Sequence, residues 1–164
     1  MKNMEGLKNN DVIMKKKKMK RLPRGLRNNN PLNIKYTPQA EPWVGQVGTD
    51  GDFCIFQSME LGYRAAFRLL HTYNMKYRIF TVQEIIYRWA PPLDRNNTPG
   101  YIRRVCEVAG LSETTQIVVG SWIADKREEA IRMVWAMAKV ELGDRWVKDA
   151  DMEVVRRGYE LAMK

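Results

Sequence analysis

The stretch RGLRNNNPLNIKY, residues 24–36, constrains the fold most, because it interrupts the chain between a leader and a body. It holds three consecutive asparagines and an Asn-Pro step, and Pro38 and Pro42 follow it closely. Proline breaks helices and sheet ladders, whereas asparagine tolerates left-handed backbone and bonds to its own backbone. We therefore expect residues 24–42 to form a loop without regular structure, with the folded body starting near Pro23.

The excess positive charge of the chain lies in residues 1–35. The whole chain carries a net charge of +9, and residues 1–35, with 11 basic and 2 acidic residues, carry the same +9. A domain that reads DNA normally carries its basic patch on the folded body, which is balanced here. We expect residues 1–22 to be a flexible basic leader, with residues 15–21 able to contact anionic polymers, and residues 23–164 to form a single domain.

Several classes of protein are excluded by what the sequence lacks. No apolar run approaches the roughly 20 residues that span a bilayer, and the first residues lack the apolar region of a secretory signal. We interpret Cys54 and Cys106 as buried thiols, since two cysteines define no disulfide framework. His71 is the only histidine and reads as structural. Without paired metal ligands or a Gly-rich loop after a strand, the sequence predicts no metal and no other cofactor.

The rest of the sequence predicts a mainly α, or α+β, domain with about five helices and one small β-hairpin. Asp50-Gly51 is a hairpin signal, which places the hairpin near residues 43–56. Helix-start signals stand at Ser58, at the Thr81–Glu84 capping box, at Thr98-Pro99 and at Asp125. The expected helices are 58–73, 82–90, 99–109, 126–142 and 151–162.

Glu141 differs from the other carboxylates in its position on a helix. In MAKVELGDRW it lies in the last turn of an apolar helix, where the helix dipole and the apolar neighbours Val140 and Trp146 would raise its pKa. A carboxylic acid that stays protonated near neutral pH can act as the general acid in cleaving a glycosidic bond. The alternative is a solvated glutamate in an ordinary helix. Glu60 and Glu84 lie in first helical turns, and we interpret them as structural.

Aromatic and amide side chains beside the loops favour a sugar-binding cleft. Trp43, Trp89 and Trp146 all flank polar loops. Flat rings stack on sugar faces, and amides bond hydroxyl and N-acetyl groups. Core packing and tight turns explain the same residues, so both interpretations stay open. The candidate cleft residues are Arg27, Asn28, Asn29, Asn30, Asn33, Trp89, Asn96 and Asn97.

Two resemblances bear on function. RGLRNNNPLNIKY, W-x-G-Q-x-G-x-D-G-x-F, and the run from Thr81 through RWAPP to NNT resemble a family of short phage and prophage proteins, described as structural or as virion-associated lytic proteins. MAKVELG is similar to the segment of lytic transglycosylases and lysozyme-like enzymes in which a helix ends at the catalytic glutamate. In those enzymes this helix comes early in the chain, whereas here it comes late.

These resemblances imply a lysozyme-like fold and a phage-type protein that degrades peptidoglycan, with Glu141 as general acid. A lytic transglycosylase needs one carboxylate, whereas a hydrolase needs a second, for which Asp50 and Asp52 are the candidates. The expected partners are peptidoglycan glycan strands and other virion proteins, and the expected location is the host cytoplasm or the virion. Two alternatives remain: a non-enzymatic virion protein with a glycan-binding cleft, and a nucleic-acid-associated protein that acts through its leader.

Overall fold

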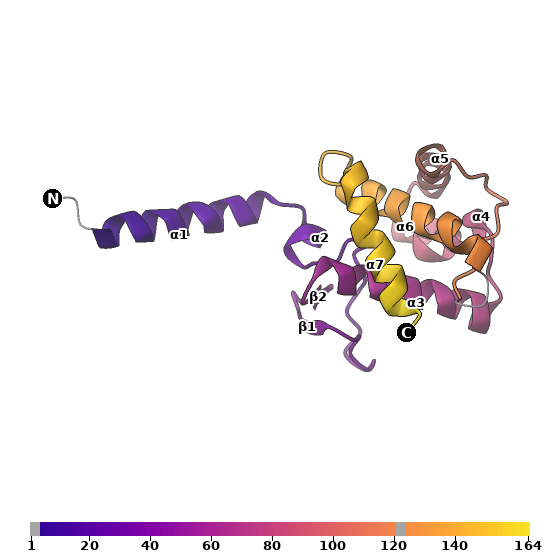
Figure 1. The fold of residues 1–164 in the computed structure, drawn as a ribbon, viewed down its shortest axis with the longest axis horizontal. Helices are drawn as coiled ribbons and strands as arrows, with labels where there is room; N and C mark the ends of the chain where they lie inside the picture. Colours follow the sequence, from indigo (N-terminus) through magenta and orange to yellow (C-terminus); the bar gives the residue numbers. More distant parts are fainter. Residues whose placement is uncertain (1–3, 121–123) are drawn as a thin grey trace.

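The computed structural model describes residues 4–120 and 124–164 (Figure 1). Within these residues it confirms the predicted fold class, which is mainly helical with one small antiparallel sheet. The strands are β1 (Gln46–Thr49) and β2 (Cys54–Phe56). The helices are α1 (Met4–Arg21), α2 (Arg24–Arg27), α3 (Met59–Tyr77), α4 (Val82–Trp89), α5 (Thr98–Ala109), α6 (Arg127–Leu142) and α7 (Met152–Ala162), with short 3₁₀ turns at Pro92–Asp94, Ala124–Lys126 and Asp149–Asp151.

The leader is helical from Met4 to Arg21, whereas a flexible segment was expected. Lysine, methionine and glutamate are good helix formers, and no proline interrupts this stretch. Residues 9–18 are exposed, and α1 projects away from the other helices (Figure 1). The prediction for residues 1–3 lies outside the described residues.

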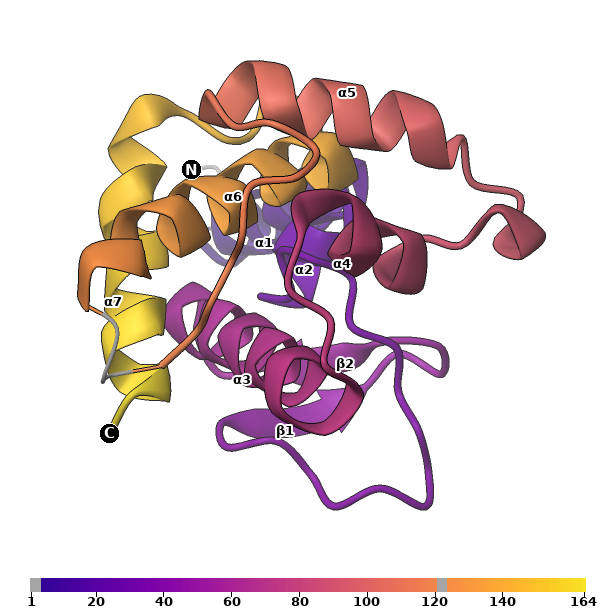
Figure 2. The same ribbon diagram turned by 90° about the vertical axis from the view of Figure 1, so that its right-hand side faces the viewer.

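The body is built around α3, α6 and α7, with α5 lying along α6 and the hairpin on the side of α3 away from α6 (Figure 2). Helices α3 and α7 approach closely because Gly158 has no side chain. A Cβ atom at Gly158 would stand 2.5 Å from the Cβ of Tyr63. The rings of Phe67 and Tyr159 meet edge to face, with centroids 5.2 Å apart. This edge-to-face contact between aromatic rings adds to the burial of their apolar area.

Several predicted helix starts are confirmed, and two need correction. Thr81 and Glu84 form the predicted capping box of α4. Helix α5, however, begins one residue earlier than expected, because Asn97 is its N-cap and Thr98 donates a hydrogen bond to the carbonyl of Ala90 at 2.5 Å. Asp125 does not cap α6, since it lies within a 3₁₀ turn that leads into the helix. Local sequence thus predicted that these helices exist, but the first residues of α5 and α6 differ from the predicted ones.

The stretch 24–42 contains one element that the sequence did not predict, the single helical turn of α2. Beyond it the chain is irregular, as expected from the prolines. Asn29 and Asn33 adopt left-handed backbone, with φ of 49° and 51°. A Cβ atom at Gly62 of α3 would come within 2.1 Å of the carbonyl oxygen of Asn29, so glycine allows the loop to lie directly on α3.

Among the described residues, no helix is both long enough and apolar enough to cross a bilayer. This agrees with the composition of the chain, in which even the longest helices carry charged residues.

Candidate active site

The amide side chains of the Asn28–Asn30 run bond to the protein itself. Asn30 is fully buried, and its Nδ2 donates to the carbonyls of Ile34 and Cys54 at 3.0 and 2.9 Å, while its Oδ1 accepts from the Ile34 N–H at 2.8 Å. Asn29 donates to the carbonyl of Phe56 at 3.1 Å. The run therefore holds the loop against β2, which gives the consecutive asparagines of the sequence a structural role.

Asn28 is also buried, and it connects the loop to the turn of the hairpin. Its Nδ2 donates to Oδ2 of Asp50 at 2.8 Å. Arg24 donates to Asp50 at 2.5 Å and to Asp52 at 2.8 Å, so one guanidinium joins both carboxylates. The Arg24 guanidinium holds the pKa of the Asp50 carboxyl well below its usual range. Asp50 therefore stays ionised, and its immediate role is to hold the hairpin against α2.

Glu141 lies in the last turn of α6, as predicted, and its carboxylate is held by two other segments. Asn33 Nδ2 donates to Oε2 at 3.1 Å, and the Tyr101 hydroxyl donates to Oε1 at 3.1 Å. Tyr101 belongs to α5 and is almost fully buried. The glutamate is therefore a junction between α6, α5 and the loop after Asn30.

The environment of Glu141 favours the protonated acid. Burial raises the pKa of its carboxyl above the ordinary value, because removal from water disfavours the charged form. The hydrogen bonds from Asn33 and Tyr101, together with the nearby Trp89 side chain, lower the pKa of Glu141 but offset only part of the rise. The direction agrees with the sequence prediction, and burial is the main cause.

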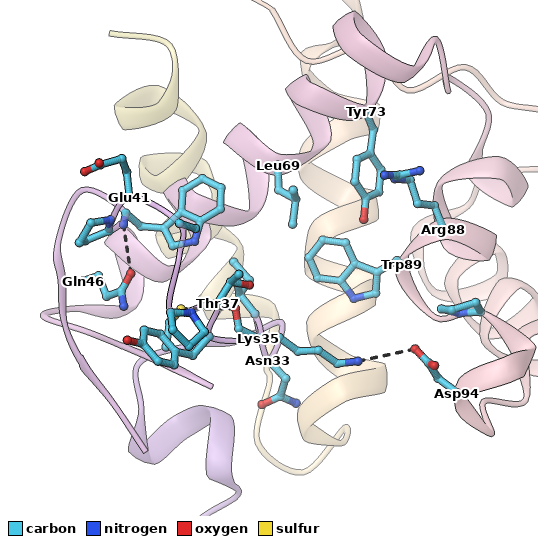
Figure 3. A pocket seen from close by; sticks show the side chains of 18 residues that line it. Asn33, Lys35, Thr37, Glu41, Gln46, Leu69, Tyr73, Arg88, Trp89 and Asp94 are labelled. Carbon is cyan, nitrogen blue, oxygen red and sulfur yellow. Dashed lines mark hydrogen bonds and ion pairs between the residues drawn. The ribbon is translucent and has the colours of Figure 1, made fainter. Parts of the chain in front are cut away.

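Asn33, which bonds to this glutamate, and Trp89 both line a pocket of about 720 Å³ (Figure 3). We call it the aromatic pocket, since four large rings stand along its wall. It lies between the 33–46 segment, α3 and α4. Its lining residues are Asn33, Ile34, Lys35, Tyr36, Thr37, Pro38, Ala40, Glu41, Pro42, Trp43, Gln46, Cys54, Leu69, Tyr73, Arg88, Trp89, Pro91 and Asp94.

Glu141 is not itself one of the lining residues, but two of them contact it. Asn33 and Trp89 line the aromatic pocket; Asn33 donates a hydrogen bond to the Glu141 carboxylate, and the Trp89 side chain lies near enough to lower the pKa of that carboxyl. Trp89 is partly buried and meets the ring of Tyr73 at 6.3 Å between centroids. The carboxyl therefore lies directly behind the pocket wall that Asn33 and Trp89 form.

The other predicted site residues lie elsewhere. Asp50 and Asp52 do not line the aromatic pocket, and Arg27 is exposed without lining it. Asn96 donates to the carbonyl of Pro91 at 3.1 Å, and Asn97 caps α5 by accepting from the Gly100 N–H at 3.1 Å. Of the eight predicted cleft residues, only Asn33 and Trp89 line the pocket.

Residues that were interpreted as structural have structural partners. His71 Nδ1 lies 2.6 Å from the carbonyl oxygen of Val119. Glu84 closes the capping box, and these backbone hydrogen bonds lower the pKa of its carboxyl. Glu60 pairs with Arg157 at 3.5 Å. Cys54 is buried as predicted, whereas Cys106 is only partly so.

Sequence reasoning missed Tyr101 and Arg88. Tyr101 looks like one more apolar residue of an amphipathic helix, and nothing in the sequence pairs it with a glutamate 40 residues later. Arg88 precedes Trp89 at the end of a helix, where a basic residue is expected from the helix dipole alone. Within residues 4–120 and 124–164, no group of three or more His, Cys, Asp or Glu side chains is placed to hold a metal ion.

The fold and this geometry define a mainly helical protein in which a partly buried glutamate lies behind an aromatic pocket. No protein-family model matches the chain. Protein P5 of Pseudoalteromonas phage PM2 is 40% identical over 97 residues, which cover 57% of this chain and 60% of that protein. The chain thus spans less than two thirds of the length of this phage relative. The similarity agrees with the predicted resemblance to phage proteins.

Proposed function

We propose that this protein serves a phage by cleaving the glycan strand of peptidoglycan, with Glu141 as the general acid. One observation carries the proposal: a carboxyl with a raised pKa is held by two donors from distant segments, beside a pocket walled by aromatic rings. General acid catalysis needs a carboxyl that holds its proton closer to neutral pH than a free glutamate does, and burial shifts the pKa of Glu141 in that direction. Aromatic walls suit the apolar faces of sugar rings.

The hydrogen bonds to Glu141 leave its acidic proton available. Each carboxylate oxygen accepts one hydrogen bond, from Asn33 or from Tyr101. A protonated carboxyl therefore keeps both contacts and still has one O–H to donate. The two donors also fix the orientation of the carboxyl, which lowers the cost of bringing acid and substrate together.

The positions of Asp50 and Asp52, the predicted candidates for a second carboxylate, favour a lytic transglycosylase over a hydrolase. Both are bound to Arg24 and neither lines the pocket. Of the two carboxylates that do line it, Asp94 pairs with Lys35 at 3.6 Å, so a hydrolase would have to use Glu41. In the transglycosylase route Glu141 protonates the glycosidic oxygen and the bond to C1 breaks. The C6 hydroxyl of the same muramic acid then attacks C1 and returns its proton to Glu141, so no second carboxylate is needed.

Purified peptidoglycan incubated with the protein tests the proposal by mass analysis of the released fragments. Fragments with 1,6-anhydromuramic ends are the expected product, and reducing ends would show a hydrolase instead. An absence of fragments, for a protein that is folded and binds the glycan, would contradict the enzymatic function.

A second function is favoured by one observation, namely that Glu141 joins three segments and does not itself line the pocket. A virion structural protein that binds glycan without cleaving it would use the same aromatic pocket and keep Glu141 only for its architecture. It would share the phage relationship and the expected contact with other virion proteins. The fragment analysis separates the two functions, because the structural protein binds peptidoglycan but releases nothing.

The leader supports a further proposed contact, with anionic polymers. Lys15, Lys16, Lys17 and Lys18 are exposed on α1, which projects from the body. Clustered cations of this kind attract polyanions in a salt-dependent way. Such a contact would serve attachment, since α1 projects away from the body (Figure 1) and contributes no lining residue to the aromatic pocket.

A further inference from the structure

Arg88 is the one cation of the aromatic pocket that stacks on aromatic rings. It lies in the last turn of α4, and its guanidinium carbon stands 3.7 Å from the ring centroid of Tyr77 and 5.2 Å from that of Tyr73. Figure 3 shows the guanidinium lying against Tyr73 at the pocket wall. Stacking on aromatic rings restricts a guanidinium, and the N–H groups along its edge can still donate hydrogen bonds in its plane.

No carboxylate of the described residues forms a salt bridge with Arg88. The other pocket cation, Lys35, pairs with Asp94. Glu84 stands one helical turn before Arg88, but its Oε2 accepts hydrogen bonds from the backbone N–H groups of Phe80 and Thr81 at 3.2 and 3.0 Å. Arg88 therefore forms no salt bridge with an acid of the residues that the structure describes, and it lines a pocket large enough for a sugar.

We infer that Arg88 forms a subsite for a carboxylate of the bound glycan. A guanidinium presents parallel N–H donors that match the two oxygens of a carboxylate, and its stacked position orients them in advance. The inference rests on the proposed function and adds the class of glycan: a strand that carries muramic acid rather than an uncharged N-acetylglucosamine polymer. The carboxylate comes either from the lactyl ether of muramic acid or from its stem peptide.

Three probes separate these sources in binding measurements by titration calorimetry. Chitobiose is uncharged, N-acetylglucosaminyl-N-acetylmuramic acid adds one lactyl carboxylate, and a disaccharide tetrapeptide carries its carboxylates on the peptide. All three are titrated into the full chain carrying Glu141→Gln, which prevents turnover, with and without Arg88→Gln. Arg103→Gln is the matched control, because Arg103 is exposed on α5 and does not line the aromatic pocket.

Arg88→Gln is expected to weaken binding of a carboxylate-bearing probe by about 10- to 100-fold, the usual cost of a lost hydrogen bond to a charged group. Chitobiose binding should stay within about twofold, and Arg103→Gln should change neither. An effect on the disaccharide acid assigns the lactyl group, and an effect confined to the tetrapeptide probe assigns the stem peptide. Arg88→Lys keeps the charge without the planar fork, so it should recover only part of the affinity.

Two results would overturn the inference while leaving the proposed function intact. One is unchanged binding of both acidic probes by Arg88→Gln, and the other is an equal loss for chitobiose, which would make Arg88 a wall residue only. A parent chain that binds none of the three probes would instead overturn the proposed function, and the inference with it. Thermal unfolding of each variant checks that the fold is kept, and Arg88→Lys serves if Arg88→Gln does not fold.

Discussion

Replacing Glu141 by glutamine removes the acidic proton while it keeps the shape of the side chain. The amide oxygen can accept from Asn33, and the amide N–H₂ can donate to the Tyr101 hydroxyl, whose oxygen accepts after its own hydrogen rotates away. Both contacts therefore persist as neutral hydrogen bonds. If Glu141 is the general acid, the rate of peptidoglycan cleavage should fall by about 10²- to 10⁴-fold, the range typical of lost acid catalysis.

The stability of the same variant should depend on pH in a defined direction. Burial raises the pKa of Glu141 in the folded protein, so the folded state binds its proton more tightly than the unfolded chain does. The stability from this proton is fully present below the unfolded pKa and is lost as pH rises through the folded pKa. Glutamine does not titrate, so Glu141→Gln should be as stable as the parent at neutral pH or more so, with the difference shrinking in acid.

Both quantities can be measured on one preparation. Soluble fragments released from peptidoglycan give the rate, and urea unfolding at several pH values gives the free energy of unfolding. The parent rate should also decline as pH rises through the pKa of Glu141, because the ionised form has no proton to give. A Glu141→Gln variant as active as the parent would refute the catalytic role. A variant less stable by several kcal/mol at neutral pH would show that the charge itself holds the three segments together.

Four other perturbations test the remaining assignments. Glu84→Gln should cost about 1 kcal/mol of unfolding free energy by weakening the capping box and leave cleavage unchanged, so an inactive but folded variant would contradict its structural role. Asn30→Ala should destabilise the protein by roughly 2–4 kcal/mol in urea unfolding, because two buried carbonyls and an N–H lose their partner. Trp89→Ala should cost about 2–3 kcal/mol, since the ring is only partly buried, and should reduce glycan affinity at least about tenfold; unchanged affinity would remove Trp89 from the site. Deleting residues 1–21 should leave the melting temperature within about 2 °C and weaken salt-sensitive binding to anionic polymers, and a large drop would show that α1 packs on the body.

Local signals predicted the elements of this fold well. The capping box at Thr81 and Glu84 and the hairpin turn at Asp50-Gly51 depend on residues at most four apart, so short-range sequence contains their whole physical cause. Helix α1 was not predicted, because two local signals in the leader disagree. A run of lysines reads as a disordered tail from its charge, although lysine itself has a good intrinsic helix propensity.

The site was only partly predictable, because its decisive contacts are long-range. The position of Glu141 at a helix end, and the direction of its pKa shift, followed from local reasoning. Its partners, 40 and 108 residues away, did not. The asparagine run shows a second limit, since an amide bonds to a sugar hydroxyl or to a backbone carbonyl with the same groups. Only the fold shows that Asn30 bonds to backbone groups of its own loop and of β2, whereas Asn33 bonds to the side chain of Glu141.

The proposed chemistry depends on which segments lie side by side in space, and not on the order in which they follow one another in the sequence. In the lytic enzymes to which MAKVELG is similar, the glutamate helix precedes the rest of the site, whereas α6 follows it here. Yet the end of α6 lies against α2 and the loop that follows it: a Cβ atom at Gly25 of α2 would stand 2.5 Å from Leu142 Cδ2, and Asn33 of the loop bonds to Glu141. The loop then leads into the hairpin, so helix end, loop and hairpin are contiguous in space although the chain visits them in another order. A general acid needs a buried carboxyl, fixed donors and an adjacent pocket, and none of these depends on which segment is synthesised first.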